Sequence, residues 1–263
     1  MGKTKINERF SAIQQAKKNL FVPYIVAGDG GLDLLNDRIQ MLDEAGAAAI
    51  ELGIPFSDPV ADGPTIQEAS IRALELNTTL DKVLDTLEPT SDSRDIPIIL
   101  MTYINPIFTL GVEYFAKKCQ RVGVDGVIIP DIPMEEEALV KDSFEKHDIA
   151  FIRLAALTST PDRLETIAAS SEGFLYAVSV AGTTGARATH QERVYNYLKQ
   201  LKQTSRVPVL AGFGVSTPEQ AHQLSKHCDG VIVGSKIVDL LHQGKEDEIQ
   251  KLIQESVQTS LVK

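Results

Sequence analysis

The sequence is poor in the residues that build disulfide frameworks and metal clusters. It has no tryptophan and only two cysteines, Cys119 and Cys228, which lie far apart and form no CxxC pair. No apolar run approaches the length of a membrane span, and the N-terminal residues lack the apolar core of a secretory signal. We therefore expect a cytoplasmic protein with free thiols, and neither a secreted scaffold nor a membrane protein.

Positive charge is also scarce. The chain carries 26 Lys and Arg residues against 36 Asp and Glu residues, which gives a formal net charge of -10 and a pI near 5.0. Such a field repels nucleic-acid backbones and anionic lipid surfaces, so neither is an expected partner. A small phosphorylated ligand is still compatible with this charge, because backbone N–H groups and helix N-termini bind phosphate without a lysine.

Short apolar runs rich in Val and Ile recur through the whole chain, and a helical pattern follows each one. Runs that are apolar on both faces are typical of parallel strands covered by helices. A length of 263 residues allows two small domains, but the unbroken rhythm favours one. We predict an α/β fold in which residues 1–263 form a single-domain (β/α)8 TIM barrel. The eight runs begin at Phe21, Ala47, Ile96, Val124, Ile149, Phe174, Val207 and Gly230.

Helices are predicted in every interval, with some beyond those that a barrel needs. Residues 7–18 form an extra helix before the first run, two helices follow the second run, and residues 235–242 form a short extra helix after the eighth. Thr65, in a capping-box sequence, and Thr160 and Thr217, each before a proline, mark predicted helix starts. Further amphipathic stretches lie near residues 32–45, 110–121, 134–146, 190–203 and 245–257.

Functional side chains of such a barrel lie at the C-terminal ends of its strands, and the second run has a glutamate there. Side chains alternate in a strand, so Glu51 points into the mouth of the barrel if Ile50 and Leu52 face the helices. Burial disfavours the charged carboxylate and raises its pKa toward the range of a general acid or base near neutral pH. The alternative is a carboxylate that is simply solvated by its loop.

The loop after this strand carries Asp58 and Asp62 among prolines and glycines, so its shape is restricted. Such a loop can present one carboxylate beside Glu51 in a different environment, which gives two acids two roles. The sequence is equally compatible with Asp62 and Gly63 only capping the helix that follows.

Glycine-bearing loops follow each of the last three strands. The loops after strands 7 and 8 of a barrel, with a short extra helix, form a recurrent phosphate site, and Gly214, Gly234 and Ser235 fit that site. Thr184 and Gly185, which follow the sixth strand, would cover the site as a lid.

The strand ends offer few other catalytic groups. Tyr176 and Phe213 are interpreted as walls of a pocket rather than as nucleophiles. The five histidines fall on predicted helices or their starts, and no lysine lies inside a run. The sequence therefore predicts no metal site and no histidine base. It also argues against Schiff-base chemistry, for which Lys236, just beyond the last run, is the alternative candidate.

Seven segments of the chain follow one another in a recognisable order: FVPYIVAGD, ELGIPFSDPVADGPTIQ, MTYINPIF, GVDGVIIPDIP, AGTTGAR, GFGVS and GSKIV. In these segments and their spacing, the sequence resembles the tryptophan synthase α subunit family over nearly its whole length. The resemblance implies a (β/α)8 barrel that acts as a lyase in tryptophan biosynthesis. The implied reaction is a retro-aldol cleavage of indole-3-glycerol phosphate to indole and D-glyceraldehyde 3-phosphate.

The resemblance also implies roles for single residues. Glu51 corresponds to the general acid/base, and Asp62 to the group that stabilises the indole nitrogen. Tyr176 resembles the pocket tyrosine, and Thr184 the lid threonine that bonds the loop aspartate on closure. Tyr24 stands where some relatives have phenylalanine, which concerns the lining of the indole pocket. The residues that resemble the phosphate cradle are Gly185, Phe213, Gly214, Gly234 and Ser235.

The same resemblance implies a partner. Indole passes to a tryptophan synthase β subunit in a heterotetramer of two α and two β chains, and the loop around Asp58 resembles the surface that meets it. No cofactor is implied for this chain, because pyridoxal phosphate belongs to the β subunit. Two alternatives within the family are a chain that acts mainly as an allosteric partner and a free-standing lyase that releases indole. Another phosphate-binding barrel, such as a sugar-phosphate isomerase or a thiamine-pathway enzyme, fits the glycine loops but not the two carboxylates.

Overall fold

The strands form one parallel sheet that closes on itself. The structure, a computed structural model, describes residues 2–178, 187–212 and 214–259. Within these ranges the strand order is β5-β4-β3-β2-β1-β9-β8-β7-β6, and all pairings are parallel. The strands are β1 (Leu20–Val26), β2 (Ile50–Gly53), β3 (Ile98–Met101), β4 (Gly126–Ile128), β5 (Ala150–Phe151), β6 (Arg153–Ala156), β7 (Leu175–Val178), β8 (Val209–Gly212) and β9 (Gly230–Val233).

The fifth apolar run supplies both ends of this strand order. β5 pairs with β4, β6 pairs with β7, and only Ile152 separates β5 from β6 in the chain. The run therefore crosses from one neighbour to the other and closes the barrel. The eight runs correspond to the eight positions of a (β/α)8 barrel, which confirms the predicted fold class.

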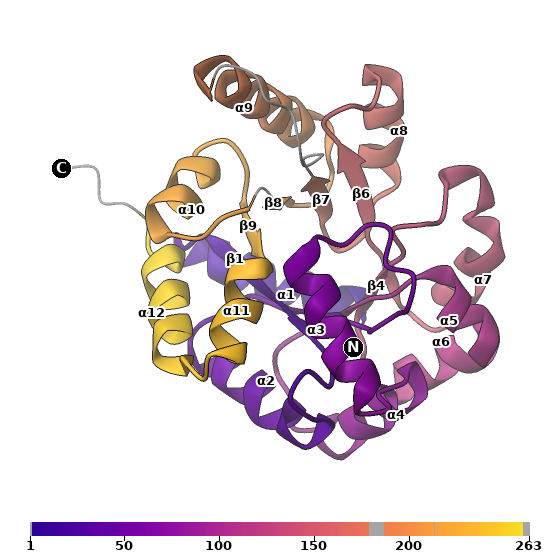
Figure 1. Cartoon of the computed structure of the whole chain (residues 1–263). Helices are drawn as coiled ribbons and strands as arrows, with labels where there is room; N and C mark the ends of the chain where they lie inside the picture. The colour runs from indigo at the N-terminus through magenta and orange to yellow at the C-terminus, as the bar shows by residue number, and fades with distance from the viewer. Residues whose placement is uncertain (1, 179–186, 213, 260–263) are drawn as a thin grey trace.

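Helices form an outer ring around the strands (Figure 1). The predicted extra helices are present before β1, between β2 and β3, and after β9. The helices of the described residues are α1 (Lys3–Gln15), α2 (Leu35–Glu44), α3 (Pro64–Glu75), α4 (Leu80–Leu87), α5 (Ile104–Leu110), α6 (Val112–Arg121), α7 (Ala138–Lys146), α8 (Pro161–Ser170), α9 (Arg187–Thr204), α10 (Pro218–Ser225), α11 (Ser235–His242) and α12 (Glu246–Val257). None of these helices is long and apolar enough to cross a membrane.

The helix starts predicted at Thr160 and Thr217 are confirmed, and three details of the predicted helices differ in the structure. The helix expected near residues 110–121 is preceded by a separate helix, α5, because Gly111 adopts a positive φ of 91° and breaks the chain between the two. The capping box at Thr65 is absent, because α3 already begins at Pro64 with Gly63 as its N-cap. Thr160 is an N-cap without a side-chain hydrogen bond, whereas Thr217 accepts one from the Gln220 N–H.

Strand alternation divides the core into two layers. Ile50 and Leu52 pack in the outer layer between strands and helices. The inner layer fills the barrel, where Ile6 and Phe10 of α1 pack against residues such as Val22 and Ile99. Helix α1 thus covers the N-terminal end of the barrel and lies across its centre in Figure 1. The opposite end, where the strands finish, is left for a site.

Candidate functional site

A cavity of about 220 Å³ lies at the C-terminal ends of the strands. Six of the nine predicted site residues line it, and they come from both halves of the chain. Thr184, Gly185 and Phe213 lie outside the described residues. The lining consists of Tyr24, Glu51, Asp62, Ile66, Met101, Tyr176, Gly212, Gly214, Val215, Ile232, Gly234 and Ser235.

Glu51 points into this cavity from β2, as the alternation with Ile50 and Leu52 predicted. Its side chain is 0% exposed, and neither carboxylate oxygen has a hydrogen-bond partner among the described residues. Burial, with a smaller effect from the negative charge of Asp62, raises the pKa of Glu51 to about 8. The alternative of a loop-solvated carboxylate is wrong, and Glu51 is mainly protonated at neutral pH.

Asp62 reaches the same cavity from the loop before α3. The Tyr103 hydroxyl donates a hydrogen bond of 3.1 Å to Asp62 Oδ2, and it accepts one of 2.9 Å from the Ala61 N–H. Burial raises the pKa of Asp62, while the bond from Tyr103 opposes that rise. The N-cap of α3 is Gly63, with no side-chain cap bond, so the interpretation of Asp62 as a simple helix cap is wrong.

The two acids therefore differ in their surroundings. Glu51 is fully buried and receives no hydrogen bond from any described residue, whereas Asp62 accepts one from Tyr103. Such a pair suits one group that gives and takes a proton and a second that stays ionised and stabilises positive charge. Tyr103 was not among the predicted site residues. It is 41 positions from Asp62 in sequence, and only the fold brings the two together.

Tyr24 and Tyr176 line the cavity, and the ring of each lies against a glycine of the neighbouring strand. A Cβ atom on Gly53 would lie 2.0 Å from the Tyr24 hydroxyl oxygen, and one on Gly212 would lie 2.3 Å from Cε2 of Tyr176. Any side chain at Gly53 or Gly212 would displace these rings. The glycines at the ends of β2 and β8 thus make room for the tyrosine walls.

The glycine loops after β8 and β9 also line the cavity. Gly234 is the N-cap of α11 and Ser235 is its first residue, while Gly214 follows β8 with a positive φ of 66°. The N-terminal N–H groups of α11 therefore begin at the cavity wall, where the helix dipole favours an anion. These are the loops in which the sequence predicts phosphate binding.

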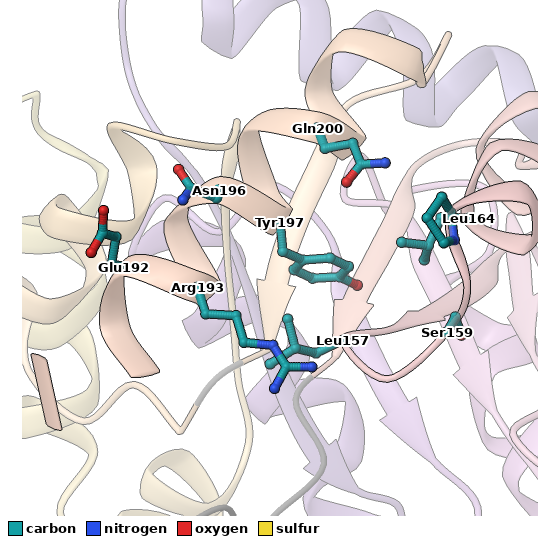
Figure 2. A pocket seen from close by; sticks show the side chains of 9 residues that line it. Leu157, Ser159, Leu164, Glu192, Arg193, Asn196, Tyr197 and Gln200 are labelled. Atoms are coloured by element: carbon teal, nitrogen blue, oxygen red, sulfur yellow. The ribbon is translucent and has the colours of Figure 1, made fainter. Parts of the chain in front are cut away.

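A larger cavity of about 450 Å³ lies between α8 and α9 (Figure 2). Its walls include Leu157, Leu164 and Arg193, and the Tyr197 hydroxyl donates a bond of 2.6 Å to the Ala155 carbonyl oxygen. Among the described residues that line it there is no predicted site residue and a single carboxylate, Glu192. Size alone therefore does not identify the site, and the paired acids favour the smaller cavity. The described residues contain no group of three or more His, Cys, Asp or Glu side chains that could hold a metal ion.

Comparison with known proteins decides the family. A family model described as the tryptophan synthase alpha chain matches residues 10–263. A tryptophan synthase alpha chain from Oceanobacillus iheyensis is 63% identical over 257 residues, which make up 98% of each chain. The chain belongs to the tryptophan synthase alpha chain family. Members of this family are lyases that catalyse the α reaction of tryptophan synthase, the cleavage of indole-3-glycerol phosphate, and this chain is one of them.

Solved structures of the family share the fold. The alpha subunit from Legionella pneumophila has a TM-score of 0.87 at 33% identity, with 97% of both chains covered. A structure of tryptophan synthase from M. tuberculosis in a ligand-free form has a TM-score of 0.85 at 31% identity, with 95% of this chain and 96% of that chain covered. Both belong to the alpha chain family or its complex, so the barrel described above is the family's barrel.

Proposed function

We propose that Glu51 and Asp62 carry out the cleavage of indole-3-glycerol phosphate in the cavity at the C-terminal ends of the strands. The observation that carries this assignment is the pair of carboxyl groups that face one cavity in unlike surroundings. Glu51 has a pKa of about 8 and no hydrogen-bond partner among the residues that the structure describes, so it can exchange a proton with a ligand. Asp62 is oriented by Tyr103.

The reaction needs one proton donor that later becomes a base. Glu51 donates its proton to the indole ring carbon that bears the side chain, which makes a positively charged indolenine. Asp62, as a carboxylate, accepts the ring N–H and stabilises that charge. Glu51 then takes the proton of the hydroxyl on the adjacent side-chain carbon. The electron pair of the carbon–carbon bond returns to the ring, the aldehyde forms, and Glu51 is protonated again.

The rest of the cavity suits the two ends of this substrate. We assign the phosphate to the rim formed by Gly214, Gly234 and Ser235, where the N-terminus of α11 offers N–H donors. Tyr176 forms a wall of the indole pocket. Thr184, Gly185 and Phe213 complete the proposal as the lid and part of the phosphate cradle, on the strength of the family motif alone.

A β subunit is the proposed partner, in a heterotetramer of two α and two β chains. The loop between β2 and α3 supports this, because Val60 is 83% exposed and Asp58 is exposed, only a few residues from Asp62. A loop that exposes an apolar side chain this close to Asp62 is available for contact with a partner. We assign pyridoxal phosphate to that partner only, and we place the enzyme in the cytoplasm, which the two free, buried thiols support.

Glu51→Gln tests the assignment most simply. The amide is nearly isosteric but cannot deliver the proton, so turnover should fall by about 10²–10⁴-fold while the chain still folds and binds substrate. Indole release measured at saturating substrate gives the rate, and circular dichroism checks the fold. Glu75→Gln, an exposed glutamate at the end of α3, is the matched control and should keep full activity. Turnover of Glu51→Gln near the wild-type rate would refute Glu51 as the acid/base.

The same assay separates this function from a mainly allosteric role. The isolated chain and the chain with added β subunit are compared for indole release. An allosteric partner without its own chemistry would release none in either case. The presence of both acids in the cavity favours catalysis.

A further inference from the structure

The Tyr24 side chain spans the mouth of the barrel beside Glu51. Tyr24 pairs with Glu51 in the register of β1 and β2, so both side chains point to the cavity. The end of the Tyr24 side chain nearest the backbone lies next to Gly234. A Cβ atom added to that glycine would be 3.6 Å from Tyr24 Cβ and Cδ1. Its hydroxyl lies over Gly53, two residues beyond Glu51 on the same face of β2.

The Tyr24 side chain is largely buried, and its hydroxyl has no hydrogen-bond partner in the described part of the chain. The residue is only 8% exposed, and no described group accepts a hydrogen bond from the hydroxyl or donates one to it. The hydroxyl of a largely buried tyrosine normally has such a partner, and Tyr24 lines the cavity, so its unpaired hydroxyl points to a ligand there. The apolar part of the ring is held by Val26, Ile66 and Val238.

The surroundings keep this hydroxyl protonated. Burial raises the pKa of Tyr24 well above its usual value, and the negative charges of Asp62 and Glu51 raise it further. The hydroxyl is therefore a donor throughout the working pH range, with an oxygen-bearing ligand as its natural acceptor.

We propose that the Tyr24 hydroxyl donates a hydrogen bond to the oxygen of the substrate hydroxyl on the carbon attached to the indole ring. The proposal rests on the function proposed above, in which the phosphate lies at Gly234 and the reacting carbon lies beside Glu51. The ring of Tyr24 then runs along the three-carbon chain of the substrate, and its hydroxyl ends at the reacting hydroxyl. When Glu51 removes the proton of that hydroxyl, the bond from Tyr24 stabilises the negative charge that develops on the oxygen. Tyr24 is thus a further catalytic residue.

Tyr24→Phe removes only the hydroxyl and tests this role. The value of kcat/KM for indole-3-glycerol phosphate should fall roughly 3- to 10-fold, as expected for the loss of one hydrogen bond. The second probe is 3-(indol-3-yl)propyl phosphate, which keeps the ring and the phosphate but lacks both chain hydroxyls. Its Kd, measured by calorimetry, should stay within about twofold of the wild-type value, because Tyr24 has no oxygen to bind there.

Two outcomes would overturn the proposal. An unchanged kcat/KM would mean that the hydroxyl contributes nothing, and an equal weakening of substrate and analogue would mean that Tyr24 acts through packing of its ring. Tyr114→Phe, which removes a hydroxyl from a half-exposed tyrosine on α6, is the matched control and should change neither value. The proposed function itself fails differently, through a Glu51→Gln chain that still turns over or an analogue that does not bind the wild-type chain.

Discussion

Two fully buried carboxylates lie at opposite ends of the barrel, and they differ in their hydrogen-bond and charge partners. Asp125, at the N-terminal end, accepts hydrogen bonds from the Gly2 N–H at 2.8 Å and the Ile98 N–H at 3.1 Å, and Lys5 Nζ lies 3.7 Å away. Glu51, at the C-terminal end, has no partner in the described residues. Burial raises the pKa of both, but the groups around Asp125 oppose the rise.

The difference shows how one fold separates stability from chemistry. Asp125 ties the strand β3 and the start of α1 together with bonds that are satisfied in the resting protein. Glu51 is left in a state that is costly for the fold, because a buried acid without donors binds its proton more tightly than in water. The same environment gives Glu51 a proton that it can donate to a substrate.

The largest expected loss of stability comes from removing the carboxylate of Asp125, whose hydrogen bonds are all made within the protein. Asp125→Ala leaves two buried N–H groups without an acceptor, so the free energy of unfolding should fall by roughly 2–4 kcal/mol. Turnover per folded molecule should not change, since Asp125 is far from the cavity. Urea titration followed by fluorescence of the tyrosines measures the first, and the indole assay the second. A selective loss of turnover at normal stability would show that the two ends are not separate in function.

Glu51→Gln should stabilise the protein, which is the reverse effect. The folded pKa of about 8 exceeds the usual value of 4.5, so the wild type loses stability as the pH rises from 4.5 toward 8, while the glutamine variant does not. The variant should gain up to about 4 kcal/mol at pH 8 and almost nothing at pH 4. Urea titrations of both chains at the two pH values provide the comparison. A variant that is less stable than the wild type at pH 8 would contradict it.

The pH profile of the reaction should carry the same pKa. Glu51 has to be protonated when substrate binds, so kcat/KM should fall above pH 8, about tenfold for each further pH unit. On the acid side, kcat/KM should fall once Asp62 is protonated, and the raised pKa of Asp62 places that limb above the usual value of 3.8. Initial rates at low substrate concentration give the profile. A flat profile between pH 7 and 10 would contradict the assignment.

Tyr103→Phe should give the smallest effect, because it alters the second acid only indirectly. Its hydroxyl holds the pKa of Asp62 down, so its loss should raise that pKa and move the acid limb of kcat/KM to higher pH. At neutral pH the decrease in kcat/KM should be about threefold, the lower range for one hydrogen bond. Tyr114→Phe again serves as the control. An unmoved acid limb would show that Tyr103 has only a structural role.

Much of this site follows from local rules in the sequence. Alternation in β2 predicts that Glu51 points inward, and the barrel rhythm predicts that Gly214, Gly234 and Ser235 gather at one rim. The structure confirms both positions. The sequence places the start of α3 at Pro64, but spacing alone leaves open whether the Asp62 side chain caps that helix or faces the cavity. The structure decides this through Gly63, which is the N-cap, and through Tyr103, which bonds Asp62.

Features that depend on distant parts of the chain were not predictable. The bond from Tyr103 to Asp62 and the passage of Tyr24 over Gly53 both require the register between strands, which single-sequence patterns do not contain. The fifth run pairs with β4 through β5 and with β7 through β6. This change of partner was not predictable either, because it depends on closure of the whole barrel. The single-domain organisation of residues 1–263 and the roles of Thr184, Gly185 and Phe213 stay predictions.

The protonation state of Glu51 in the free enzyme tests the central claim most directly. Carbon-13 NMR of glutamate labelled at its side-chain carboxyl, with the Glu51 signal assigned by its absence in Glu51→Gln, follows the titration of this one group. We predict a midpoint at about pH 8, with the neutral acid dominant at pH 7. A midpoint near the ordinary value of 4.5 would contradict the account, because Glu51 would then have no proton to give to the ring.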